Sequence, residues 1–296
     1  MRSDGKRVKA VNPMYEIVPY IMPRRYDAQN FVNVQVDEDS VRNYLKMKRS
    51  QGIRMDHMTV LIAAYLRTCA QYPILNRFVI GKKIYQRNTF SVCFVMLKKG
   101  PDGKPADTIL KVYLEPEDDI FTVNKKLQDA IQLNSKAKYN NSMDKFIHFL
   151  LSLPFLPSLV IGAARLMDWY GILPRKIIDL SPFHTSLFVT NLASINTNYI
   201  YHHLYDFGTT SIFIAMGKIV PDYRNNRDDR RVMPLGIVMD ERIASGHDFS
   251  RMMVKIKRYL KDPTLLETPY RPNAGETDET PGAGEAESPK EVASID

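Results

Sequence analysis

The residues best suited to acid–base chemistry lie in two short polar segments in the second half of the chain. The first, residues 240–246, reads Asp-Glu-Arg-Ile-Ala-Ser-Gly and directly follows an apolar run. An ordinary glutamate has a pKa of about 4.3 and is a feeble base, but burial can raise a carboxyl pKa to about 6–7, where it works as a general base. A buried glutamate at position 241 would therefore be able to accept a proton. The competing interpretation is a salt bridge with Arg242 or Arg25 that leaves the segment inert.

The second segment, residues 201–208, reads Tyr-His-His-Leu-Tyr-Asp-Phe-Gly. Within it, His202 and Asp206 have the spacing His-x-x-x-Asp. An imidazole titrates near neutral pH, so His202 is a second candidate base. The competing interpretation is that two adjacent histidines in an aromatic loop are packed and hydrogen-bonded as structure.

The charge of the chain is unevenly distributed. The 296 residues include 41 Lys and Arg against 33 Asp and Glu. Eight of the acids and only two of the bases fall in the last 30 residues, so residues 1–266 hold 39 bases and 25 acids, a net charge of +14. A body this basic favours anionic partners such as nucleic acid, anionic lipid or a phosphorylated cofactor. No interleaving of aromatic and basic residues accompanies the charge, so we expect no role in nucleic-acid binding.

The cysteine content and the two ends of the chain exclude several classes of protein. Cys69 and Cys93 are the only cysteines and form no Cys-x-x-Cys pair, which excludes a disulfide scaffold and a cysteine-rich zinc module, and we expect no metal. The polar start leads into no apolar core, so we expect no secretory signal and a cytoplasmic location. We expect residues 1–14 to be an N-terminal extension and residues 268–296, rich in Pro, Gly, Glu and Thr, to be a disordered acidic tail.

Hydrophobic periodicity between these ends alternates between strand and helix. The last helix has the clearest pattern, with apolar residues at helical spacing from Phe249 to Leu260 and Asp248 as its expected N-cap. A mixture of strands and helices in this order indicates an α/β or α+β two-layer sandwich. The pattern predicts strands at residues 31–36, 89–97, 108–114, 186–192, 211–216 and 232–239, and helices at residues 41–52, 56–72 and 249–262.

Residues 146–164 form an apolar stretch without a formal charge, between Lys145 and Arg165. Nineteen such residues are long enough to be considered as a membrane span, but Pro154 and Pro157 interrupt them. The sequence favours two short buried helices broken at the prolines. The alternative is peripheral membrane contact through residues 143–176, since Trp169, Tyr170 and several basic residues flank the stretch.

Several motifs resemble those of one enzyme family in the same order. The strand and loop at residues 233–246 resemble the active-site motif of the dihydrolipoyl acyltransferases of 2-oxoacid dehydrogenase complexes and of chloramphenicol acetyltransferase, which reads Leu-Pro-Leu, a strand, then Asp-His-Arg-x-x-Asp-Gly. The resemblance spans about residues 15–267, which would form one acyltransferase-like domain. Other matching segments are Tyr-Pro-Ile-Leu-Asn at residues 72–76, Val-Thr-Asn-Leu at 189–192, Ile-Ala-Met-Gly-Lys-Ile at 214–219 and Lys-Asp-Pro-Thr-Leu-Leu at 261–266.

The resemblance implies a fold, an assembly and a reaction. The implied fold is a chloramphenicol acetyltransferase-like two-layer sandwich, with a mixed sheet and helices on one face. The implied assembly is a homotrimer whose active sites lie in channels between neighbouring subunits. In the family, the motif histidine is the general base, and a Ser or Thr of the facing subunit donates a hydrogen bond to the tetrahedral oxyanion.

This chain departs from the family motif at two positions. Glu241 stands where the motif has its catalytic histidine, and Ser245 stands where it has its orienting aspartate. Arg242 and Gly246 are retained. The resemblance thus makes Glu241 the variant base and leaves the activity open.

Two further positions take their roles from the resemblance. Thr190 occupies the place of the serine in the family's Ile-Ser-Asn-Leu and is the candidate oxyanion donor, although a β-branched residue is also simply a good strand former. Arg24 and Arg25 precede the first long strand, where relatives carry an arginine that pairs with the motif aspartate. Because Ser245 replaces that aspartate, we expect the arginine's partner to be lost or to have become Glu241.

The function that follows is transfer of an acyl group from an acyl-CoA, or from a carrier-bound thioester, to an unknown acceptor. We expect no lipoyl domain in cis. The sequence shows no Gly-rich phosphate loop, and the basic body suits the phosphates of coenzyme A. The alternative is a catalytically degenerate trimeric scaffold or binding module, with or without membrane contact.

Overall fold

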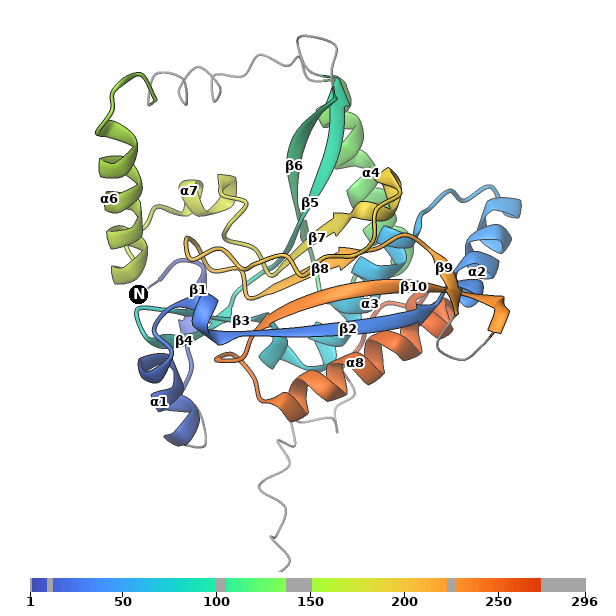
Figure 1. The fold of residues 1–296 in the computed structure, drawn as a ribbon, viewed down its shortest axis with the longest axis horizontal. Helices are drawn as coiled ribbons and strands as arrows, with labels where there is room; N and C mark the ends of the chain where they lie inside the picture. The colour runs from blue at the N-terminus through green and yellow to red at the C-terminus, as the bar shows by residue number, and fades with distance from the viewer. Residues whose placement is uncertain (1, 10–12, 100–104, 137–150, 223–226, 273–296) are drawn as a thin grey trace, which may run out of the picture.

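A mixed seven-stranded sheet packed against a layer of helices forms the body of the molecule (Figure 1). The computed structural model describes residues 2–9, 13–99, 105–136, 151–222 and 227–272. The strand order is β2-β10-β8-β7-β5-β6, with β9 paired to β10; β7 runs parallel to both β5 and β8, and the other pairs are antiparallel. The strands are β2 (Gln29–Asp37), β5 (Phe90–Lys99), β6 (Pro105–Leu114), β7 (Leu187–Asn191), β8 (Ile212–Met216), β9 (Val220–Asp222) and β10 (Arg227–Asp240).

Four helices cover one face of this sheet. They are α2 (Glu38–Ser50), α3 (His57–Gln71), α4 (Ile120–Lys136) and α8 (Gly246–Lys261). Helix α3 lies between α4 and α8 and is buried from Met58 to Cys69. Asp56 caps it by accepting a hydrogen bond from the Thr59 backbone N–H, and it ends before Pro73. The predicted fold class, a two-layer sandwich with a mixed sheet and helices on one face, is confirmed.

The two faces of the sheet carry different sets of side chains because successive strand residues alternate in direction. Toward the helices, Val189, Ile214 and Ile237 stand opposite one another on neighbouring strands, all fully buried. One residue along, Cys93, Phe188, Phe213 and Val238 form a second buried row on the far face. The far face is therefore apolar too and requires its own cover.

Residues 199–207 run across that far face. The His202 ring stacks on Phe213 with 4.0 Å between centroids, and Tyr201 packs edge-on against Phe31. The segment crosses β10 at Gly236, where a Cβ would come within 2.3 Å of the Ile200 carbonyl oxygen. Glycine at this position is what allows the two backbones to approach so closely.

A small antiparallel sheet in the order β1-β4-β3 lies beside the body. The first residues of the chain contribute to it, since β1 pairs with β4 and Arg2 and Asp4 are buried. Arg87 ties this sheet to the body by donating to the Thr209 carbonyl at 2.8 Å. The elements here are β1 (Gly5–Arg7), β3 (Arg77–Ile80), β4 (Lys83–Arg87) and the helix α1 (Pro13–Ile21).

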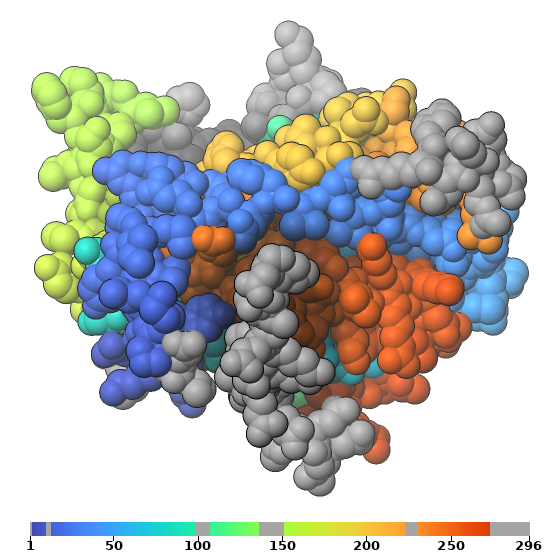
Figure 2. Space-filling view, turned by 60° about the horizontal axis from the view of Figure 1, so that its bottom comes forward, coloured from blue at the N-terminus to red at the C-terminus, as the bar shows by residue number. Residues whose placement is uncertain are grey.

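The apolar stretch near residue 155 forms exposed helix. Helix α6 (Leu156–Tyr170) has only Asp168 buried, and α7 (Arg175–Leu180) has only Ile178 buried. The expectation of two buried helices is wrong for the described residues of this stretch, because an apolar composition does not determine whether other parts of the protein cover a helix. Residues 146–150 lie outside the described part. In Figure 2, the yellow-green residues of α6 project from one edge of the molecule. Within the described ranges, no helix is both long and apolar enough to cross a bilayer.

The close crossing at Gly236 predicts that an alanine substitution destabilises the protein at Gly236 but not at Gly246. We expect Gly236→Ala to lower the free energy of unfolding by about 1–3 kcal/mol, because the added methyl group must displace residues 199–201 or β10. Gly246→Ala is the matched control, since a Cβ there meets nothing within 4 Å. Urea denaturation followed by circular dichroism measures both, and equal midpoints for the two variants would contradict the assigned crossing.

Candidate active site

A fully buried carboxylate at the end of β10 holds two buried arginines. Arg242 contacts both oxygens of Asp240, from Nε at 2.8 Å and from Nη2 at 2.7 Å. Arg25 forms an ion pair with Asp240 through its Nε at 3.4 Å. Burial lowers the pKa of Arg25, while Asp240 raises it and Arg242 lowers it further. One negative charge therefore stabilises two neighbouring cations away from water.

Backbone carbonyls accept the other hydrogen bonds of the two guanidinium groups. Arg25 donates to the carbonyls of Tyr205 at 2.6 Å and Val79 at 3.2 Å, and Arg242 donates to that of Met22 at 3.0 Å. The Arg25 backbone N–H also donates to the Asp206 carboxylate at 3.4 Å. This cluster joins the end of β10 to the segment before β2, to β3 and to the loop after His202. The cluster fixes the end of β10 and therefore the position of the next residue, Glu241.

Glu241 makes neither of the two expected salt bridges. Its backbone N–H donates to the Ala28 carbonyl at 2.9 Å, and its Oε2 accepts a hydrogen bond from Asn30 Nδ2 at 2.7 Å. The side chain is half-buried. The expectation that Glu241 pairs with Arg242 or Arg25 is wrong, because Asp240, one residue earlier, occupies both arginines. For the same reason, Asp240 and not Glu241 is the partner of Arg25.

Ser245 begins helix α8 as its N-cap. Its hydroxyl accepts from the Asp248 backbone N–H at 3.1 Å, and its backbone N–H donates to the Asp248 carboxylate at 3.0 Å, which together form a capping box. The hydroxyl also donates to that carboxylate at 2.6 Å. The expected N-cap, Asp248, is instead the third residue of the helix. Ser245 is thus occupied at the helix start, and His247 is exposed beside it. Nothing in the space around Gly246 requires glycine there.

Thr190 lies far from Glu241 within one chain. It stands opposite Ala215 of β8, which in turn stands opposite Gly236 of β10. Glu241 follows five residues later and two strands away, which at about 3.3 Å per residue and 4.8 Å per strand is about 15–20 Å. Among the described residues, no side chain or backbone group forms a hydrogen bond with the Thr190 hydroxyl.

His202 lies on the same face of the sheet as Thr190. Its stacking partner, Phe213, stands opposite Phe188, and Thr190 follows Phe188 by two residues. The Nδ1 of His202 lies 2.9 Å from the His203 carbonyl and donates to it, so that a neutral ring keeps its lone pair on Nε2. Burial lowers the pKa of His202, which favours this neutral form. Asp206, the expected partner at His-x-x-x-Asp spacing, instead accepts from Arg25.

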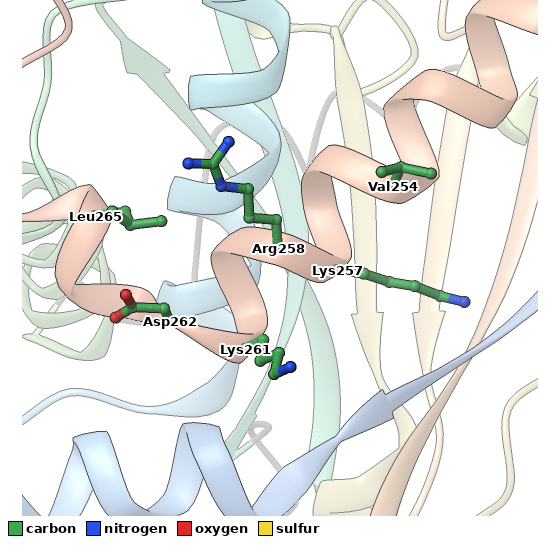
Figure 3. A pocket seen from close by; sticks show the side chains of 6 residues that line it. All are labelled: Val254, Lys257, Arg258, Lys261, Asp262 and Leu265. Atoms are coloured by element: carbon green, nitrogen blue, oxygen red, sulfur yellow. The ribbon is translucent and has the colours of Figure 1, made fainter.

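Other charged groups gather at the far end of α8. Lys257, Arg258 and Lys261 line an open groove of about 490 Å³ together with Asp262 and two apolar residues (Figure 3). The groove lies at the C-terminal end of α8, about 20 Å along the helix from Ser245. In the described ranges, no group of three or more His, Cys, Asp or Glu residues could hold a metal ion.

Known structures share the architecture of this chain, although no family model and no curated protein matches its sequence. Chloramphenicol acetyltransferase aligns with a TM-score of 0.53 at 12% identity, over 87% of this chain and 100% of that chain. The chain has the chloramphenicol acetyltransferase fold. A probable dihydrolipoamide acetyltransferase from Listeria monocytogenes gives a TM-score of 0.52 at 13% identity, over 86% and 94% of the two chains. The cubic core of the pyruvate dehydrogenase multienzyme complex gives 0.51 at 10% identity, over 88% and 93%.

Sequence reasoning missed two residues that position the side chains of the candidate site. Asp240 and Asn30 were not among the candidate residues, yet they set the position of Arg25 and of the Glu241 side chain. The signal for Asp240 was available, since it directly follows the apolar run of residues 232–239 and an arginine follows two residues later. Asn30 gave no such signal, because its proximity depends on the pairing of Met239 with Asn30 between β10 and β2.

The two-arginine cluster predicts a large effect of a small substitution. Asp240→Asn leaves two buried cations without their shared anion, and we expect it to lower the free energy of unfolding by about 3–5 kcal/mol. Asp179→Asn is the control, because the carboxylate of Asp179 pairs with Arg175 in a side chain 39% exposed and such surface pairs contribute about 1 kcal/mol or less. Guanidinium denaturation compares the two, and an Asp240→Asn protein as stable as the wild type would contradict the role of the cluster.

Proposed function

We propose that this chain transfers an acyl group from an acyl thioester, either acyl-CoA or a carrier-bound thioester, to a small acceptor. The fold supports the class of reaction, because chloramphenicol acetyltransferase and dihydrolipoamide acetyltransferase share it. The basic body, with a net charge of +14 over residues 1–266, would attract the phosphates of coenzyme A. We also propose a cytoplasmic location.

The anchored carboxylate of Glu241 is the observation that carries this proposal. Asn30 holds Oε2 at 2.7 Å, and no described residue forms a hydrogen bond with Oε1. The Oε1 of this half-buried residue would take the proton of the acceptor thiol or hydroxyl as the acceptor attacks the thioester carbonyl. A tetrahedral oxyanion forms and receives a hydrogen bond from a threonine hydroxyl. The intermediate then expels the coenzyme A thiolate, which takes the proton back from Glu241.

Thr190 is the proposed oxyanion donor, and it would act across a subunit interface. A separation of about 15–20 Å prevents Thr190 from serving Glu241 of its own chain. A ring of copies, each presenting Thr190 to the Glu241 of its neighbour, satisfies both groups. We therefore propose a homotrimer, as the resemblance to the trimeric acyltransferases implies.

His202 is a second candidate for the base. Its neutral ring, with Nδ1 donating to a carbonyl and Nε2 free to accept, is the form that a general base requires. It lies on the same face as Thr190, so this arrangement would need no neighbouring copy. Glu241 remains our first choice because it occupies the place of the motif histidine.

A non-catalytic role as a trimeric scaffold or binding module is favoured by one observation. The hydroxyl of Ser245, which replaces the orienting aspartate of the motif, is occupied by Asp248 in the α8 capping box. No residue is then left at that position to orient a base.

An acyl-transfer assay separates these proposals. Acetyl-CoA with dihydrolipoamide or chloramphenicol as acceptor is the probe, and the acetylated acceptor is measured by mass spectrometry. We expect Glu241→Gln to lower the rate by about 10²–10⁴-fold and Thr190→Val by about 10²–10³-fold. The exposed Glu117→Gln is the matched control and should leave the rate unchanged.

The pattern of losses identifies the base. His202→Asn should leave the rate within about twofold of the wild type, with the exposed His247→Asn as its control. A loss with His202→Asn but not with Glu241→Gln would move the base to His202. Turnover that survives both substitutions would contradict both, and a wild-type protein that neither turns over nor binds CoA in calorimetry would favour the scaffold.

A further inference from the structure

Helix α6 exposes apolar side chains along almost its whole length. Phe155, directly before it, is 84% exposed, and Leu159 and Tyr170 are each 69% exposed. A helix that is apolar on most sides is normally buried in protein or lipid. The large apolar side chains exposed by more than two fifths in and beside α6 are Leu151, Leu153, Phe155, Leu159, Ile161, Leu166, Trp169, Tyr170 and Ile172.

Helix α1 extends this surface through the turn between β3 and β4. The Lys82 amino group lies 5.3 Å from the Tyr20 ring of α1, and a Cβ on the neighbouring Gly81 would lie 3.0 Å from the Trp169 carbonyl of α6. Figures 1 and 2 both place α1 and α6 at the same end of the molecule. We call the exposed apolar residues of α1, α6 and α7 the end surface. From α1 it includes Met14, Tyr15, Ile17, Tyr20 and Ile21, and from α7 Ile177 and Leu180.

Asp168 holds α6 with its apolar side chains outward. This buried carboxylate accepts from Arg2 Nη2 at 2.8 Å and lies 3.2 Å from His184 Nε2. Arg2 also donates to the Asp168 carbonyl at 2.7 Å. Polar contacts of Asp168 with Arg2 and His184 therefore fix α6 to the body, while most of its large apolar side chains stay exposed.

The charges near the end surface favour an anionic medium. Arg165 and Lys176 are exposed on α6 and α7, and Lys83 is exposed beside the turn that joins α1 and α6. The acids of α6 and α7 are neutralised, Asp168 by Arg2 and Asp179 by Arg175. Helix α1 adds one half-buried acid, Glu16. Long basic side chains can bury their stems in the apolar boundary while their charges reach lipid phosphates.

We propose that the end surface binds an anionic lipid bilayer, with α6 lying in the membrane interface. The combination of leucine and isoleucine with Trp169 and several exposed tyrosines is typical of segments at the headgroup level. A second copy of the chain fits less well, because the proposed trimer contacts involve Glu241 and Thr190, which lie outside α1, α6 and α7. Acyl transfer and membrane binding would use different surfaces.

Trp169 makes the proposal directly measurable, because it is the only tryptophan of the chain. Full-length protein is mixed with vesicles of phosphatidylcholine, with or without phosphatidylglycerol, and floated on a density gradient. We expect flotation with the anionic vesicles, a shift of the Trp169 emission to shorter wavelength, and quenching by lipids with brominated acyl chains. Arg165→Gln combined with Lys176→Gln should weaken the preference for phosphatidylglycerol.

A matched pair of double variants tests the surface itself. Leu159→Gln with Leu166→Gln should weaken vesicle binding by roughly tenfold or more. Leu133→Gln with Val254→Gln, which changes two equally exposed apolar residues on α4 and α8, should leave binding unchanged. Wild-type protein that stays unbound, or Trp169 emission that does not change with anionic vesicles, would overturn the proposal. A change of molar mass in light scattering for the α6 variant alone, without lipid, would assign the surface to a second copy and overturn it as well.

Discussion

The pairing of one buried carboxylate with two buried arginines determines the geometry of the candidate site. Asp240 lies between Arg25 and Arg242, and backbone carbonyls of three separate segments accept the remaining hydrogen bonds. A buried cluster with more cations than anions is stable only when every partner is in place. The end of β10, the segment before β2 and the loop that carries His202 are consequently held in one arrangement. Because Glu241 directly follows Asp240, this cluster also determines where Glu241 lies.

Much of the fold could be predicted because apolar periodicity reports directly on burial. Helix α3 has apolar residues on nearly all sides and is buried, and the apolar run at residues 232–239 lies in the buried part of β10 as predicted. The N-cap of α8 was misplaced because Ser245 and Asp248 are both good capping residues and bond to each other. Helix α6 was misjudged because the same apolar pattern describes a buried helix and one that faces lipid. The partner of Glu241 depends on strand register, which no local pattern contains.

The proposed base and the proposed oxyanion donor lie on different parts of one chain. Glu241 is anchored at the end of β10 by Asn30, whereas Thr190 lies near the middle of the sheet, in register with Gly236. This separation is what an interface site requires, because each copy then offers a base at one place and an oxyanion donor at another. The end surface on α1, α6 and α7 lies outside both. The same chain could therefore assemble, catalyse and bind a membrane without conflict among the three surfaces.

The most direct test of the account is complementation between two inactive variants. Glu241→Gln and Thr190→Val chains are produced together, so that mixed trimers form. If the site lies between copies, the interface between an intact Glu241 and an intact Thr190 recovers about a quarter of the wild-type acyl-transfer rate, the fraction of intact sites expected for random assembly. If each chain carries its own complete site, the mixture remains as inactive as the separate variants, and the account of Glu241 and Thr190 acting across an interface is contradicted.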